Sequence, residues 1–250
     1  MVTLSLTVCV RCTVCPYCSL ELAFLLDSSS KLIGNAWTGI LDFTSSVISA
    51  YNINPNCVRA AVISYSDNAV VNIELNRFNN INSLQQAVQQ LRLLNGGSNL
   101  ANAFNLLRTR VFVTNVIRQG AALIAVVVTD QIQPSQQLTN EANSVKGQGI
   151  RVIAVGITRQ GRVDTNTLFG VTTNNYAVSV TDYNQLSGVV SRVTAPGIWG
   201  CFEVTTTTST TTPVPVPGTC LFNAFHNMSL HLLLCVLLHN NCNVMSTRDC

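Results

Sequence analysis

Short apolar segments alternate along this chain with segments whose apolar residues recur every three or four positions. Leu22 to Leu26 is apolar at every position, which is typical of a strand buried on both faces. One face of a helix is indicated next by Trp37, Ile40, Leu41, Thr44, Val47, Ile48 and Tyr51. The core of the protein is therefore expected to begin with a strand followed by a helix.

Two β-rich segments, Val58 to Tyr65 and Ala69 to Leu75, follow and are separated by residues 66–68. Because the sequence Ser-Asp-Asn between them favours a tight turn, the pattern predicts a hairpin that adds an antiparallel edge strand. Further helices are predicted at 83–93, 99–109, 136–147, 164–169 and 183–193, and further strands at 122–129, 151–157 and 176–180. The alternation predicts an α/β fold, a doubly wound, mostly parallel sheet with one antiparallel edge strand, flanked by helices in three Rossmann-type layers.

Composition supports a large buried core, since 47% of the 250 residues are apolar and 10% are charged. The net charge is +3 and the arginines are scattered, so we expect no nucleic-acid partner. The apolar stretch 228–238 is about 11 residues long, well short of the roughly 20 residues that span a bilayer. We therefore expect no membrane-spanning segment.

The character of the chain changes after Cys201. Residues 205–212 are seven threonines and one serine, and a proline-rich stretch follows, a composition typical of extended, O-glycosylated stalks. We expect four parts: a cysteine-containing N-terminal segment at 1–17, a domain at 18–201, a linker at 202–218, and a cysteine-containing tail of unassigned fold at 219–250. The N-terminal segment is interpreted as a truncated signal region or a mispredicted start. Asn227 in the tail begins an N-glycosylation motif.

Nine of the ten cysteines lie outside the predicted core, which contains Cys57 alone. This distribution favours disulfides around the domain and an oxidising compartment, so we expect a secreted or extracellular protein. Cys57 is interpreted as a buried apolar residue or as the partner of a terminal cysteine. The evenly spaced Cys9, Cys12, Cys15 and Cys18 leave an alternative open, an intracellular iron or zinc protein.

Three oxygen-rich loops, at residues 27–30, 96–99 and 129–130, follow predicted strands or precede a helix. The carboxyl ends of parallel strands converge on one crevice, where these loops can meet. Their carboxylate and hydroxyl oxygens are ligands that Mg²⁺ accepts. The structural alternative is that Asp27 and Asp130 cap loops and that Gly96-Gly97 forms a turn with positive φ. A phosphate-binding loop is disfavoured because no Gly-Lys-Ser/Thr follows.

These features resemble the von Willebrand factor type A domain, also called the integrin I-like domain, over roughly residues 18–200. The resemblance rests on AFLLDSS at 23–29, AVISYSD at 61–67, LNGGSN at 94–99 and VVVTD at 126–130, in the family's order and spacing. It implies a mostly parallel sheet flanked by helices, and a protein that binds other proteins outside the cell through Mg²⁺ or Mn²⁺ at the strand ends. It also implies a disulfide that closes the domain, here Cys18 to Cys201, with unpaired thiols as the alternative.

The resemblance further implies which residues form the metal-ion-dependent adhesion site (MIDAS). Asp27 and Ser29 match its first two positions, Ser98 stands where the family usually has threonine, and Asp130 matches its final aspartate. Lys31 occupies the position of the second serine. The motif is therefore degenerate.

The lysine changes what we expect of the cofactor. An ammonium about 4 Å from a divalent ion, at an effective dielectric constant near 20, would be repelled by roughly 8 kcal/mol. In addition, Gln131 replaces a common glycine of the family. We expect a site without metal, in which Lys31 pairs with Asp27 or Asp130. A weakened Mg²⁺ or Mn²⁺ site, with the lysine extended into solvent, is the alternative.

Catalysis finds little support, because the histidines lie in the tail and no core serine or cysteine has a recognisable base. We therefore expect a non-enzymatic, extracellular protein-binding or adhesion module of the von Willebrand factor A type, whose partner is a protein or matrix ligand. The alternative is a structural spacer in a multidomain secreted protein whose recognition module, lectin-like or otherwise cysteine-rich, is missing here.

Overall fold

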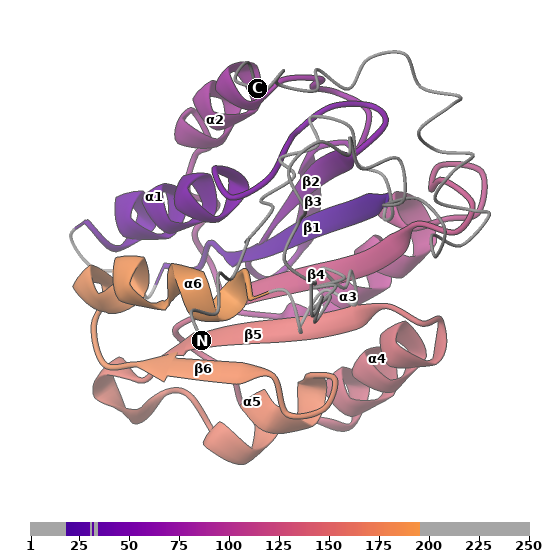
Figure 1. Cartoon of the computed structure of the whole chain (residues 1–250). Helices are drawn as coiled ribbons and strands as arrows, with labels where there is room; N and C mark the ends of the chain where they lie inside the picture. The colour runs from indigo at the N-terminus through magenta and orange to yellow at the C-terminus, as the bar shows by residue number, and fades with distance from the viewer. Residues whose placement is uncertain (1–18, 31, 33–34, 196–250) are drawn as a thin grey trace, which may run out of the picture. The chain divides into compact units, whose positions relative to one another are not determined.

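Six strands form one sheet at the centre of the fold. The computed structural model describes residues 19–30, 32 and 35–195. The strands are β1 (Leu20–Asp27), β2 (Val58–Tyr65), β3 (Ala69–Ile73), β4 (Ala122–Thr129), β5 (Arg151–Ile157) and β6 (Ala177–Val180). Their order is β3-β2-β1-β4-β5-β6 (Figure 1), and all neighbours are parallel except β2 and β3. The predicted doubly wound sheet with an antiparallel edge strand is confirmed.

Helices cover both faces of this sheet (Figure 1). One face packs against α1 (Ala36–Ile48), α2 (Ile81–Gln89) and the last helical segment, the 3-10 helix η3 (Tyr183–Val189) with α6 (Val190–Val193). The other face packs against α3 (Leu100–Leu106), the π-helical turn η1 (Leu107–Val111), α4 (Gln136–Gly147) and α5 (Thr165–Val171). A short 3-10 turn, η2 (Arg159–Gly161), follows β5. In the described part of the chain, no helix is long and apolar enough to cross a bilayer.

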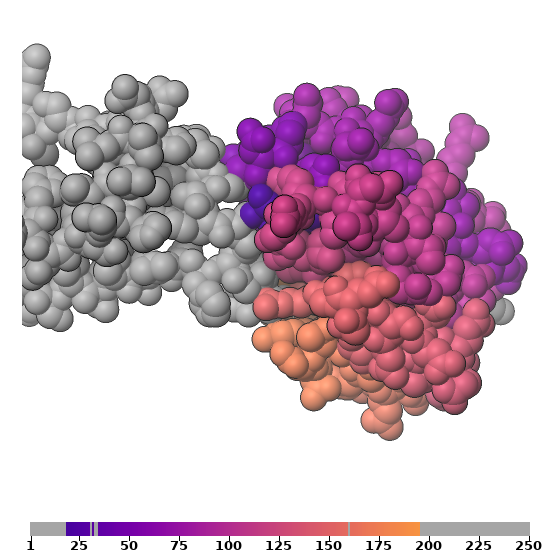
Figure 2. Space-filling model, turned by 90° about the vertical axis from the view of Figure 1, so that its right-hand side faces the viewer, coloured from indigo at the N-terminus to yellow at the C-terminus, as the bar shows by residue number. Residues whose placement is uncertain are grey.

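The covering of both faces explains why β1 is apolar throughout its centre. Side chains alternate along a strand, and Leu22, Phe24 and Leu26 enter the core under α1, whereas Ala23 and Leu25 enter the core under α3. All five are fully buried. In the space-filling view, the described residues change in colour from purple through magenta to orange, from the earlier to the later part of the chain (Figure 2).

Most predicted elements are confirmed, and four of them, β2, β4, α4 and β5, have the predicted bounds. The end of the helix predicted at 83–93 is wrong. This helix begins earlier, where the Asn80 side chain accepts a hydrogen bond from Ser83 N, and it ends at Gln89. The Leu91 carbonyl instead accepts a hydrogen bond from Trp37 Nε1, so this segment is tied to α1 outside any helix.

The helix predicted at 99–109 and the last helix are also less regular than expected. The former is α-helical as far as Leu106 and then π-helical, and the latter is mostly a 3-10 helix. Apolar residues at three- and four-residue spacing indicate a buried helical face, but they do not distinguish these helix types.

The predicted disulfide between Cys18 and Cys201, the Asn227 glycosylation site, the linker and the tail all lie outside the described residues. Cys57, the one cysteine within residues 19–195, is buried and disulfide-bonded. Its partner therefore lies beyond the described residues, in agreement with the interpretation that Cys57 pairs with a terminal cysteine.

Candidate functional site

Asp27 forms the centre of the candidate site, at the carboxyl end of β1. The order of the strands reverses between β1 and β4, and such a switch point is where α/β sheets bind ligands. The Asp27 carboxylate is fully buried. Its Oδ2 accepts hydrogen bonds from Ser98 Oγ at 2.8 Å and Thr129 Oγ1 at 2.9 Å, and its Oδ1 accepts one from Ser29 N at 3.1 Å. The structure therefore brings together Asp27, Ser29 and Ser98, as the sequence predicts.

Asp130, the fourth predicted residue, follows β4 and is also fully buried. Its Oδ2 accepts a hydrogen bond from Tyr183 Oη at 2.8 Å and forms an ion pair with the Arg162 guanidinium. Among the described residues, no other cation is ion-paired with Asp130. Asp130 therefore has a positive partner that the sequence analysis did not single out.

The two carboxylates differ in their electrostatic surroundings. The pKa of Asp27 is raised to about 6, mainly by burial and also by the negative charge of Asp130, while the hydrogen bond from Ser98 opposes the rise. The described donors to Asp27 are neutral, whereas Asp130 is matched by a guanidinium. Burial, together with the nearby Asp130, also raises the pKa of the Tyr183 phenol above its ordinary value, so Tyr183 acts as a hydrogen-bond donor.

The neighbours of Ser29 hold the loop in place. Ser28 Oγ accepts a hydrogen bond from Leu94 N at 2.7 Å, and Ser30 Oγ donates one to the Gly96 carbonyl at 2.9 Å. These two serine side chains therefore join the loop after β1 to the loop that contains Gly96. Asp27 accepts a hydrogen bond from the loop backbone but does not cap a helix, because the N-cap of α1 is Asn35.

The turn at Gly96 positions Ser98. Gly96 has φ +99°, and a Cβ added here would clash with Asp67 Oδ2, so both conformation and space require glycine. Asp67 Oδ1 also accepts a hydrogen bond from Gly97 N at 2.9 Å. The interpretation of this pair as a structural turn is confirmed at Gly96.

Several buried side-chain oxygens at this site are suited to coordinate a metal ion. Ser29 Oγ, Asp130 Oδ1 and Gln131 Oε1 have no hydrogen-bond partner among the described residues, although such buried groups are normally satisfied. Oxygens of Asp27, Ser29, Ser98 and Asp130 form a set of hard ligands suited to Mg²⁺ or Mn²⁺. The donor chemistry fits, but Asp130 is already ion-paired. Lys31, the predicted obstacle to metal, lies outside the described residues.

A small pocket of about 50 Å³ adjoins the site. It is lined by Ser98, Asn99, Leu100, Ala101, Gln131, Ile132, Gln133, Ser135 and Leu138. The lining side chains are uncharged. This pocket offers hydrogen-bonding and apolar contacts beside Asp27.

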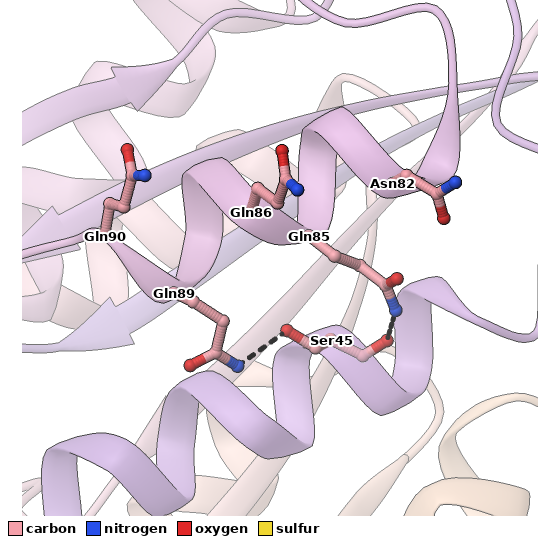
Figure 3. Close-up of a pocket in the computed structure, with 6 residues that line it drawn as sticks. All are labelled: Ser45, Asn82, Gln85, Gln86, Gln89 and Gln90. Carbon is pink, nitrogen blue, oxygen red and sulfur yellow. Dashed lines mark hydrogen bonds between the residues drawn. The ribbon is translucent and has the colours of Figure 1, made fainter.

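A larger pocket, of about 820 Å³, lies between α1 and α2 (Figure 3). It is lined by Ser45, Asn82, Gln85, Gln86, Gln89 and Gln90. Two of its amides are directed at α1, since Gln85 Nε2 donates to the Ser45 carbonyl and Gln89 Nε2 donates to Ser45 Oγ. The lining contains no acid, base or thiol, so it provides no groups for acid–base or nucleophilic chemistry.

Sequence reasoning missed three residues of the site. The sequence pattern places Thr129 in a loop without indicating its contact with Asp27, and it gives no indication of Arg162 or Tyr183 as site residues. The available signal was their position, because Arg162 and Tyr183 lie shortly after β5 and β6. The carboxyl ends of these strands lie on the same edge of the sheet as Asp27 and Asp130.

Comparisons with known proteins agree with this geometry. Residues 21–192 match the family model described as von Willebrand factor type A domain. The chain is 27% identical to Matrilin-3 of Mus musculus over 150 residues, which are 58% of this chain and 31% of the relative. It is 23% identical to the Collagen alpha-6(VI) chain of Homo sapiens over 173 residues, 69% of this chain and 8% of the relative.

A solved structure shows the same fold. Proximal thread matrix protein 1 from the mussel byssus superposes with a TM-score of 0.67 at 20% identity, covering 74% of this chain and 49% of that chain. The chain thus spans about a third of the length of Matrilin-3 and less than a tenth of the collagen chain. Because the family model matches well over half of the residues, the chain belongs to the von Willebrand factor type A domain family.

Proposed function

We propose that this protein is a non-enzymatic, extracellular module that binds a matrix protein at the carboxyl edge of its sheet. The observation that carries the proposal is the convergence of Asp27, Ser98 and Asp130 at the switch point of a von Willebrand factor type A domain. The similarity to a matrilin and a collagen chain supports a matrix protein as the partner. The frequency of cysteines supports an extracellular location.

A second part of this proposal concerns whether binding of the partner requires a metal ion. Asp27, Ser29, Ser98 and Asp130 would hold a divalent ion, and such an ion would offer an open coordination position to an oxygen of the partner. Because Asp130 is neutralised by Arg162 and Lys31 takes the place of a ligand, we propose that binding does not require the ion. The partner then has no need to provide a carboxylate.

At the carboxyl edge of the sheet, apolar contacts can provide affinity for the partner protein. Leu94 is 37% exposed although it is a large apolar residue, and its amide is bonded to Ser28 beside the site. Burying a leucine side chain at an interface contributes about 2 kcal/mol. We therefore expect Leu94 to contact the partner.

Surface plasmon resonance with immobilised collagen VI and matrilin-3 tests the proposal on the full chain. Binding to at least one of them is expected to be equal in Mg²⁺ and in EDTA. Leu94→Ser should weaken it about tenfold, which corresponds to about 1.4 kcal/mol. Phe169→Ser is the matched control, because Phe169 is also 37% exposed but lies on α5, and it should leave binding unchanged.

Three results would contradict the proposal in different ways. Failure to bind either protein counts against the proposed class of partner. Equal effects of Leu94→Ser and Phe169→Ser count against the carboxyl edge as the binding face. Loss of binding in EDTA counts against independence from metal.

A further inference from the structure

Arg162 is placed at the site by its backbone as well as by its side chain. It follows the 3-10 turn after β5, and its carbonyl accepts hydrogen bonds from Ile132 N at 3.1 Å and Gln133 Nε2 at 2.9 Å. Asp164 N in turn donates to the Ile132 carbonyl at 2.9 Å. The segment around Arg162 is therefore joined to the segment that follows Asp130, and the guanidinium is held where it can reach the carboxylate.

The ion pair lies where solvent has little access. The Asp130 side chain is fully buried and the Arg162 side chain is 22% exposed. A charged group in such a place needs a partner of opposite charge, because its hydration has been lost. Tyr183 Oη donates to the same Oδ2 and so fixes the orientation of the carboxylate. Oδ2 of Asp130 is thereby occupied by two groups of this chain, whereas Oδ1 has no hydrogen-bond partner among the described residues.

Any divalent ion at the site has to share Asp130 with this guanidinium or displace it. Sharing is unfavourable because two cations on one carboxylate repel each other. Displacement breaks the ion pair between Arg162 and the buried Asp130 carboxylate. Sharing Asp130 and displacing the guanidinium therefore both lower the affinity of the site for the ion, and both effects require Arg162 to be present.

We propose that Arg162 is the resident cation of this site and that its ion pair with Asp130 lowers the affinity of the site for divalent metal, in addition to the effect expected of Lys31. The inference rests on the proposed function, because it concerns the same binding face. On this face, the Arg162–Asp130 ion pair takes the place of a contact between Mg²⁺ and Asp130. The pair keeps Asp130 in one orientation whether or not divalent ions are present.

The test uses Mn²⁺ alone, measured by isothermal titration calorimetry on the full chain. Arg162→Gln is expected to bind Mn²⁺ at least tenfold more tightly than the wild type does. The matched control is Arg159→Gln, three residues earlier in the same loop and not ion-paired with Asp130 in the described structure, and it should bind as the wild type does. Equal affinity of Arg162→Gln and wild type, or an equal gain in Arg159→Gln, would overturn the proposal.

A second measurement does not depend on the folding of a variant. In the wild type, the guanidinium ¹⁵N–¹H signals of Arg162 should be resolved by NMR and should remain unchanged when millimolar Mg²⁺ is added. A shift that shows release of the guanidinium from Asp130 would overturn the proposal. Neither measurement requires a protein partner, so failure here is distinguishable from failure to bind collagen VI or matrilin-3.

Discussion

Thr129 Oγ1 donates a hydrogen bond of 2.9 Å to Asp27 Oδ2 and so joins the ends of β4 and β1, the two strands on either side of the switch point. Both residues are fully buried. Thr129 Oγ1 also lies 2.7 Å from the Gln131 carbonyl, on the segment that carries Asp130. One hydroxyl therefore connects the Asp27 carboxylate to the backbone of the segment that carries Asp130.

Replacing this hydroxyl by a methyl group should destabilise the protein. Thr129→Val keeps the shape of the side chain but removes a donor to a buried carboxylate, which costs about 2 kcal/mol. Urea unfolding at neutral pH measures this loss. Thr44→Val is the control, because Thr44 is equally buried but its hydroxyl donates to the Ile40 carbonyl of its own helix, and it should cost about 0.5 kcal/mol or less. Equal losses would mean that the contact with Asp27 adds nothing to stability.

Lys31→Ser should raise the affinity for Mn²⁺, since it removes a cation and restores a hydroxyl at a position of the family's motif. We expect a gain of about tenfold or more by calorimetry, equivalent to at least about 1.4 kcal/mol. Lys146→Ser is the control, because Lys146 is the other lysine of the chain and its Nζ donates to the Gly170 carbonyl away from the site. Unchanged Mn²⁺ affinity in Lys31→Ser would contradict the expected role of Lys31.

The hydroxyl of Tyr183 should stabilise the folded protein through its hydrogen bond to Asp130. Tyr183→Phe removes the donor at 2.8 Å from Asp130 Oδ2 and should lower the free energy of unfolding by about 1.5 kcal/mol. Thermal and urea unfolding measure the change. Tyr176→Phe, on a partly buried tyrosine just before β6, should change stability by less. If the two variants are equally stable, the contact between Tyr183 and Asp130 has no energetic weight.

The sequence predicts the fold well and the site in part, for physical reasons. Leu22 to Leu26 and Ala122 to Thr129 are strongly apolar because both faces of their strands are covered, and this leaves a clear pattern. Asp27, Ser98 and Asp130 follow from spacing that a family shares. Arg162 and Tyr183 could not be predicted in this way, because their contacts with Asp130 span 32 and 53 residues and depend on the paths of single loops.

At the amino end of the parallel strands, opposite the candidate site, lies a buried charge that the sequence pattern also did not reveal. Glu21, in the apolar β1, is fully buried and accepts hydrogen bonds from Arg59 and Arg118. The Arg118 guanidinium also donates to the Leu20 and Cys57 carbonyls. This network links the start of β1 to the start of β2 and to the segment before β4.

The pKa of Glu21 shows the balance of this network. Burial raises this pKa, but the hydrogen bonds from Arg59 and Arg118 and the charge of Arg118 together lower it more, so it lies below its ordinary value of 4.5. A carboxylate whose pKa is lowered by folding binds fewer protons in the folded state than in the unfolded state. Its contribution to stability is therefore fully present above pH 4.5 and is lost as the pH falls through the folded-state pKa.

Glu21→Gln should remove this contribution, because it leaves two arginines without their buried counter-charge, at a cost of about 3 kcal/mol at neutral pH. The difference in the free energy of unfolding between wild type and variant should shrink as the pH falls below 4.5, where the wild-type carboxylate becomes protonated. Glu74→Gln is the control, since Glu74 pairs with Arg110 on the surface, and it should cost less than about 1 kcal/mol. A difference between wild type and Glu21→Gln that stays constant down to acid unfolding would show that the charge of Glu21 does not stabilise the fold.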